Sequence, residues 1–186
     1  MIKLGDVQVY FTTIPAHKFL HIKNYESSGY WDFWEKQSLI PGQDCDTICD
    51  LLDSIPGRLD DLGRPNTKRS STQCMGYISD PKGRVSSWGY PRVECYGVRL
   101  PHDFPREVPE PFLLIDVPAG EYIVFEHGPF DYETENSAVE EKMRRAMAAF
   151  DIGPTGYSFD NAPGKVSYFY HDPERCWKYI RPVKKV

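Results

Sequence analysis

Runs in which apolar and polar residues alternate recur along the chain and predict β-strands. Alternation with a period of two places successive side chains on opposite faces of a sheet. Two pairs of such runs are each joined by a short turn that contains proline, and they cover residues 7–12 with 18–24 and residues 111–116 with 121–127. The other runs lie later in each half, at residues 73–79, 84–100 (interrupted near 89–91), 155–160, 165–170 and 177–183.

Apolar residues spaced three and four apart predict three helices between these strands. Residues 30–37 form a short aromatic helix, and residues 46–54 form a second one that ends before Pro56. In the second half, residues 137–140 match a capping box. One apolar helical face follows until Gly153 ends the helix, and it comprises Val139, Met143, Ala146, Met147 and Phe150.

Short patterns of the first half recur in the same order in the second half, which predicts a tandem duplication. Two constant offsets relate them, so the second copy is shorter in the middle. The matching pairs are residues 13–22 with 116–125, Gly-Arg-Val-Ser at 83–86 with Gly-Lys-Val-Ser at 164–167, and Cys95-Tyr96 with Cys176-Trp177.

We therefore expect an α+β fold made of a duplicated strand–helix–strand–strand unit. Its sheet should be mostly antiparallel, with helices on one face and a ligand groove between the repeats. One domain should span residues 1–186, with repeat one at about 1–101, a proline-rich connector at 101–111 and repeat two at about 111–186. The polar stretch at 58–72 is expected to be a surface excursion.

Charge and hydropathy exclude several classes of protein. The formal net charge is −5, and the one basic cluster, Lys68 with Arg69, is too small for a phosphate footprint, so we expect no direct nucleic-acid binding. No run approaches the ~20 apolar residues of a membrane span, and the N-terminus lacks a secretory segment. A cytoplasmic protein without membrane contact is expected.

The cysteines and histidines do not form a recognisable catalytic or metal motif. The five cysteines are an odd, scattered set, which indicates reduced thiols. Cys45 and Cys49 could face each other on a helix, but no second pair or nearby histidine completes a metal site. Nucleophile-elbow, phosphate-loop and dinucleotide-binding signatures are missing from the sequence. No metal or cofactor is expected.

Aromatic side chains are the unusual feature, with Tyr 12, Phe 10 and Trp 4, or 14% of the chain. Alternation places Glu94 and Tyr96 on one face of their strand, and Arg175, Trp177 and Tyr179 on one face of the equivalent strand. If the helices cover the opposite face, these rings lie on the open one. Rings around a concavity hold flat apolar or cationic molecules by stacking. The rings could instead fill a core or the interface of a homodimer.

Other aromatic residues extend or limit this candidate site. Tyr168 and Tyr170 alternate similarly one strand earlier, and Trp88, near a Gly-rich break, could line the rim. Core packing is favoured for the helical rings Trp31, Phe33 and Trp34. Glu94 is the only acid on the aromatic face, where it could bind a cation or position a water, or it could be an ordinary exposed strand residue.

Two segments resemble the GyrI-like family of small-molecule-binding domains. Residues 115–129, Ile-Asp-Val-Pro-Ala-Gly-Glu-Tyr-Ile-Val-Phe-Glu-His-Gly-Pro, resemble the opening of that family's second repeat. Residues 178–183, Lys-Tyr-Ile-Arg-Pro-Val, resemble its closing strand, and residues 29–34 look like its stand-alone bacterial members. The resemblance implies a pocket for bulky aromatic xenobiotics between two repeats. One stand-alone subfamily of similar length hydrolyses cyclopropane-bearing DNA-alkylating compounds in an aromatic cage.

The resemblance implies Tyr96, Trp177 and Tyr179 as cage residues. Drug-sensing relatives carry an acid in the penultimate strand, whereas residues 166–170 here have none, which favours a neutral planar ligand unless Glu94 substitutes. The leading hypothesis is binding of a planar hydrophobic molecule, with hydrolysis if Glu94 or the Tyr179 hydroxyl positions a water. The alternatives are an effector-binding module of a transcriptional regulator and a topoisomerase-inhibitor-like protein.

Overall fold

The computed structural model describes residues 1–65, 72–105, 107–172 and 176–186 of the chain. Lys68, Arg69 and Arg175 lie outside the described residues. The strands are β1 (Ile2–Leu4), β2 (Val7–Ile14), β3 (His17–Asn24), β4 (Gln73–Val85), β5 (Pro91–Pro101), β6 (Leu113–Val117), β7 (Gly120–His127), β8 (Tyr157–Phe159), β9 (Val166–Asp172) and β10 (Cys176–Lys185). The helices are α1 (Tyr30–Gln37), α2 (Cys45–Asp53), α3 (Tyr132–Ala149) and the 3-10 helix η1 (Gly153–Thr155).

All of these strands belong to one antiparallel sheet, so the expected α+β fold is confirmed. Their order is β1-β2-β7-β10-β9-β4-β5-β3-β6, and β8 pairs with β10. The order is symmetric about the β9–β4 pairing, as β7 and β10 on one side correspond to β3 and β5 on the other. The first strand of each half, β2 or β6, pairs with the second strand of the other half. A duplicated unit would produce this symmetry, although the duplication and its boundaries remain a prediction.

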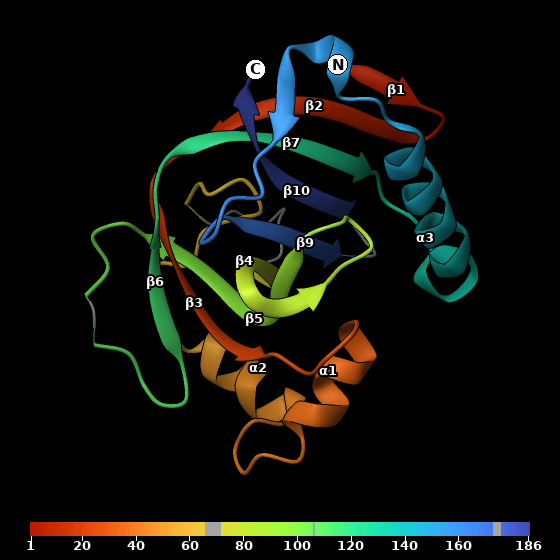
Figure 1. The fold of residues 1–186 in the computed structure, drawn as a ribbon. Coiled ribbons are helices and arrows are strands. Elements are labelled where there is room, and N and C mark those ends of the chain that lie inside the picture. Colours follow the sequence, from red (N-terminus) through yellow and green to blue (C-terminus); the bar gives the residue numbers. More distant parts are fainter. Residues whose placement is uncertain (66–71, 106, 173–175) are drawn as a thin grey trace.

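The helices cover two separate ends of one face of the sheet (Figure 1). Helices α1 and α2 pack on β3 and β5, where Phe33, Trp34, Ile48 and Leu52 are buried against Leu20 and its neighbours. Helix α3 packs on β2, β7 and β10 through Val139, Met143 and Ala146. Among the described residues, no helix therefore covers the central strands between the two helical layers.

The opposite face of the sheet is buried without any helix, because the sheet curls around it (Figure 1). Its core draws on eight strands, and the segment that follows α2 packs against it. Gly63 in that segment has a φ of +75°, and a Cβ there would lie 2.7 Å from the Ile14 side chain. The guanidinium of Arg99, which is fully buried, lies 3.6 Å from the ring centroid of Tyr168 on this face.

Most predicted elements agree with the structure, but β1 was not predicted and three other elements differ. Helix α3 begins at Tyr132 rather than at the expected capping box, because the Asp131 side chain accepts a hydrogen bond from the Glu133 backbone and caps the helix there. The segment predicted as a strand at 155–160 is divided between η1 and the short β8. Strand β4 extends to Val85 through an irregularity between Ser79 and Arg84. The interruption expected near 89–91 is present as the turn before β5.

Two expectations about burial are wrong. The stretch at 58–72 is not wholly a surface excursion, since Asp60 and Asp61 are buried and Asp61 forms an ion pair of 2.6 Å with Lys178; residues 66–71 lie outside the described part. Trp31 does not pack in the core, because 77% of its surface is exposed, whereas Phe33 and Trp34 are buried as expected. In the described ranges, no helix is both long enough and apolar enough to cross a membrane.

Candidate ligand-binding site

A cleft of about 1060 Å³ opens on the helix-bearing face, between the start of α1 and the start of α3. Strands β5, β4, β9 and β10 form its floor, and the lining residues come from both halves of the chain. Sequence reasoning expected the open face to lie opposite the helices. The cleft instead lies on their own face, because the two helical layers leave the central strands uncovered. Its volume suits a ligand of the size of a drug or somewhat larger.

Tyr96, Trp177 and Tyr179 all line this cleft, as expected from their alternation. Phe169 of β9 lies opposite Tyr179 of β10 in register, and the two rings stack with their centroids 4.5 Å apart. Trp177 lies 5.2 Å from the Phe169 ring and 4.6 Å from His171. The floor is thus a continuous aromatic surface across two strands, able to stack on a flat molecule.

Tyr168 and Tyr170 do not belong to the site, which corrects the sequence-based expectation. Both are fully buried on the closed face of the sheet, where they contact Arg99. The residues of β9 that face the cleft are Phe169 and His171, which are one position out of phase with the tyrosines. In a strand with aromatic residues at successive positions, alternation alone does not tell which set faces the cleft.

Trp88 also lies outside the lining of the cleft. Its ring packs edge-on against Tyr179 at 5.7 Å and Tyr77 at 5.9 Å, two rings that do line it. The guanidinium groups of Arg92 and Arg181 lie 4.4 Å and 4.2 Å from its centroid. Trp88 therefore supports the cleft wall from behind rather than forming the rim.

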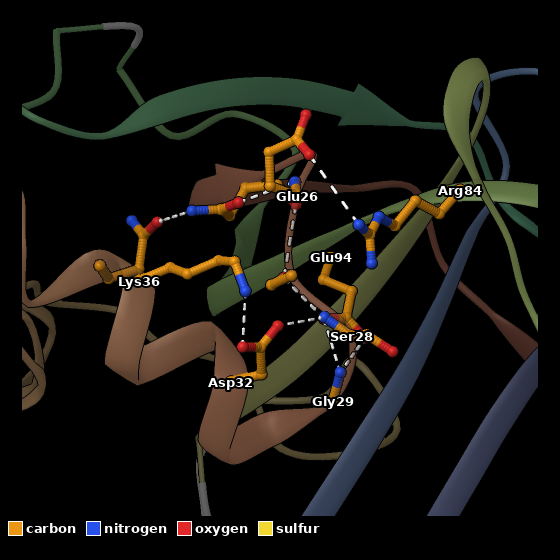
Figure 2. Close-up of polar contacts among 10 residues, drawn as sticks. Glu26, Ser28, Gly29, Asp32, Lys36, Arg84 and Glu94 are labelled. Atoms are coloured by element: carbon orange, nitrogen blue, oxygen red, sulfur yellow. Dashed lines mark hydrogen bonds and ion pairs between the residues drawn. The ribbon is translucent and has the colours of Figure 1, made fainter.

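Glu94 lies in the cleft and is only 8% exposed, so it is not an ordinary surface residue. Figure 2 shows Glu94 beside Ser28 and Gly29, which directly precede α1. The Ser27 hydroxyl donates to Oε1 at 2.6 Å, and the Gly29 backbone N–H donates to both carboxylate oxygens at 3.0 Å. Gly29 adopts a φ of +104°, a backbone conformation that glycine tolerates and other residues rarely adopt.

The carboxylate of Glu94 forms no ion pair with another of the described residues. Its hydrogen-bond partners there are a hydroxyl and a peptide group. Asp32, on the other side of Ser28, differs in this respect because it pairs with Lys36 at 2.6 Å (Figure 2). A buried carboxylate that accepts hydrogen bonds only from neutral donors is in a position to pair with a bound cation.

Burial favours the uncharged form of three titratable rings in the cleft, Tyr179, His171 and Tyr96. Burial raises the pKa of Tyr179 to about 12, so its phenol can donate a hydrogen bond but cannot act as an anion. Burial lowers the pKa of His171, whose Nε2 lies 3.0 Å from the Asn136 side chain. Burial also raises the pKa of Tyr96, and its hydroxyl donates to the Gln73 side chain at 2.7 Å.

The mouth of the cleft carries unusually exposed apolar side chains. Tyr30 and Trp31 stand on the α1 side, Tyr132 on the α3 side and Val85 at the end of β4. All four are among the exposed large hydrophobic residues of the described chain, with Trp31 at 77%. The sequence analysis missed this rim as well as Tyr77 and Phe169 on the floor, and it assigned the helical ring of Trp31 to the core.

No protein-family model matches the chain, and no curated protein matches its sequence. The structure of SAV2435 bound to tetraphenylphosphonium is similar over 95% of this chain and 94% of that one, with a TM-score of 0.57 and 14% identity. The EcmrR C-terminal domain is similar over 97% and 99%, with a TM-score of 0.51 and 14% identity. This chain spans 58% of the EcmrR chain in a complex with DNA, with a TM-score of 0.48 and 16% identity. At these identities the likeness to SAV2435 and to the EcmrR C-terminal domain establishes the fold alone, and it agrees with the α+β fold expected from the sequence.

Proposed function

We propose that this protein binds a bulky aromatic cation in the cleft between α1 and α3. The observation that carries the proposal is Glu94, a nearly buried carboxylate without a cationic partner in the described chain, on the same floor as stacked aromatic rings. SAV2435, which is bound to tetraphenylphosphonium, has a similar fold. The sequence favoured a neutral planar ligand unless Glu94 substitutes for the acid that β9 lacks. We propose a cation instead, because Glu94 lies in the cleft and can take that role.

Two forces would hold such a ligand. Rings such as Phe169 and Tyr179 provide stacking and cation–π attraction, which is strongest where water is excluded. Glu94 provides the opposite charge, and its attraction to a cation is greater in a partly buried cleft than in water. The hydrogen bonds from Ser27 and Gly29 hold the carboxylate in place before the ligand arrives, so little conformational freedom is lost on binding.

Titration with tetraphenylphosphonium followed by calorimetry tests the proposal. We expect binding to the wild-type protein and a loss of about tenfold or more in affinity for Glu94→Gln, because the glutamine keeps an acceptor for Gly29 but removes the charge. Glu140→Gln is the matched control, since it removes an exposed acid that lines the same cleft on α3. It should change the affinity by less than about threefold.

A neutral probe separates charge recognition from a structural effect of the substitution. Triphenylphosphine oxide has similar rings and no net charge, so Glu94→Gln should bind it as well as the wild-type protein does. Equal loss for the neutral and the charged probe would mean that Glu94 only shapes the cleft. Absence of tetraphenylphosphonium binding to the wild-type protein would refute the proposed function.

Hydrolysis of an activated cyclopropane is a second candidate, because Glu94 and Tyr179 line the same cleft. Glu94 could accept a proton from a water as the water oxygen bonds to a ring carbon and the adjacent ring C–C bond breaks. The electron pair of that bond would pass to the conjugated carbonyl oxygen, to which protonated Tyr179 could donate a hydrogen bond, and the proton would then return from Glu94 to the product. A time course with an activated cyclopropane substrate tests this, since water-adduct formation should exceed the uncatalysed rate and fall in both Glu94→Gln and Tyr179→Phe. If the water adduct forms at the uncatalysed rate in the presence of the wild-type protein, the hydrolysis candidate is rejected and only ligand binding remains.

A non-catalytic effector-binding role is the remaining alternative, and it is motivated by the fold shared with the EcmrR C-terminal domain. In that role the ligand would change the association of this chain with a DNA-binding or signalling protein. A pull-down with and without tetraphenylphosphonium checks this. Recovery of no partner in either condition would count against the effector role without affecting ligand binding.

A further inference from the structure

We propose that the cleft selects zwitterionic ligands, with Arg92 binding an anionic group while Glu94 binds the cationic part. This inference rests on the proposed function and deepens it by naming the ligand class. Arg92 and Glu94 are two residues apart on β5, point to the same face and both line the cleft. Their backbone positions are therefore about 6.6 Å apart along the strand.

The two aromatic neighbours of Arg92 fix the orientation of its guanidinium. The guanidinium carbon lies 4.0 Å from the ring centroid of Tyr77 and 4.4 Å from that of Trp88. Trp88 is in turn stacked on Arg181, whose guanidinium lies 3.8 Å from the Phe159 ring. A guanidinium held by rings keeps its N–H donors in one plane, in the fork that suits a carboxylate or phosphate group.

These donors have no anion to bind within the described chain. No hydrogen bond or ion pair from the Arg92 side chain is found among the described residues, and its Nη1 is buried without a partner there. Arg84, the other arginine of the cleft, differs because it is more than half exposed and approaches Glu26 at 3.9 Å (Figure 2). A positioned and unpaired guanidinium in a cleft is costly to keep desolvated, and an anionic ligand group would offset that cost.

Arg92 and Glu94 on the cleft floor favour opposite charges on a ligand. Glu94 attracts a cation and repels an anion, so a carboxylate on the ligand is favourable only if Arg92 receives it. An aromatic cation with a carboxylate on the far side of a ring would place one charge near each residue. The same molecule with the carboxylate esterified would keep the shape and lose the second contact.

Calorimetric titration with three related probes tests the inference. They are tetraphenylphosphonium, (4-carboxyphenyl)triphenylphosphonium and the methyl ester of the latter. We expect the wild-type protein to bind the carboxylate probe about tenfold more tightly than the ester. In Arg92→Gln the ratio should fall to one or below, because Glu94 then repels the carboxylate without compensation. Arg92→Lys should give an intermediate ratio, since it keeps the charge and loses the planar fork.

Arg84→Gln is the matched control, since it removes a cation from the same cleft and should keep the tenfold preference. The ratio between two probes is insensitive to a structural role of Arg92, which would weaken both alike, and the wild-type ratio requires no variant to fold. Equal binding of acid and ester by the wild-type protein, or a preference that persists in Arg92→Gln, would overturn the inference. If the ester still binds in a Glu94-dependent manner, the proposed function survives that result, whereas failure of all three probes would refute both.

Discussion

The two faces of the sheet use similar side chains for opposite purposes. On the cleft face, rings such as Tyr96 and Tyr179 line a cavity of about 1060 Å³ together with Glu94. On the closed face, Tyr168 and Tyr170 surround the guanidinium of Arg99, and all three side chains are fully buried. Aromatic content alone therefore does not identify a binding site.

The difference lies in what covers each face and in how each charge is accommodated. The curled sheet and the segment containing Gly63 close the face on which Arg99 lies. The positive charge of Arg99 is stabilised by the rings of Tyr168 and Tyr170, whose centroids lie 3.6 Å and 5.4 Å from its guanidinium carbon. The helices leave a gap above Glu94, which is held by Ser27 and Gly29. One charge is thus part of the core, and the other is available to a ligand.

Substitution of Arg99 should produce the largest effect, and on stability alone. Arg99→Ala leaves a cavity beneath Tyr168 and should lower the free energy of unfolding by about 3–5 kcal/mol. Arg99→Met fills most of that volume without a charge and should recover much of the loss. Urea unfolding measures both. An unchanged midpoint for Arg99→Ala would show that the closed face is not packed as described.

Acid should also weaken the closed face, through His17 and His21. The His17 Nδ1–H donates to the Pro15 carbonyl, so its Nε2 accepts from the Tyr168 hydroxyl at 2.6 Å, and the ring is neutral. Burial lowers the pKa of both histidines to about 4. The unfolded chain, with a pKa near 6.5, binds more protons between these values, so stability is complete above pH 6.5 and is lost as the pH falls toward 4.

Linkage predicts a loss of about 2 kcal/mol per histidine between pH 7 and pH 5. Urea unfolding at the two pH values measures the loss, and His17→Gln should reduce the difference by about half. If the wild-type midpoint is the same at both pH values, the two histidines are not held neutral in the folded protein.

A matched pair of tyrosine substitutions separates the two faces directly. Tyr179→Leu removes a ring that stacks on Phe169 in the cleft, and it should weaken tetraphenylphosphonium binding about tenfold, as expected for about 1–2 kcal/mol of ring contact. Tyr168→Leu should lower stability and leave the affinity of the folded protein unchanged. Calorimetry and urea unfolding measure the two effects. Similar affinity losses in both variants would mean that the faces are not independent.

The sequence predicted those parts of the fold and site that depend on local patterns. Alternation and helical spacing predicted most strands and the three α-helices, and α1 has the expected bounds. Alternation also placed Tyr96, Trp177 and Tyr179 on one face, since the residues next to each of them in its strand are not aromatic. It could not assign the face of Tyr168, because Phe169 beside it is also aromatic.

Features that depend on tertiary packing were not predictable in this way. Burial of Asp60 depends on the sheet curling over it, and its carboxylate binds Arg64 at 3.0 Å. The role of Glu94 depends on Gly29, which is 65 residues distant in the chain. Contacts between distant segments, such as that of Gly29 with Glu94, leave no periodic signal in the sequence. The start of α3 at Tyr132 has a local cause instead, since the Asp131 cap lies before the box at 137–140.

Trp31 provides the smallest and most local test of the cleft face. It is 77% exposed at the mouth of the cleft, so it contributes little to the core. Trp31→Ala should shift the free energy of unfolding by less than about 0.5 kcal/mol, as is usual for surface positions. It should weaken tetraphenylphosphonium binding about threefold if the ring covers the bound cation. Calorimetry measures the affinity, with Leu39→Ala, another exposed apolar residue outside the cleft lining, as the control. Equal affinity in Trp31→Ala and Leu39→Ala would mean that the Trp31 ring does not contact the ligand, and that only the floor around Glu94 binds it.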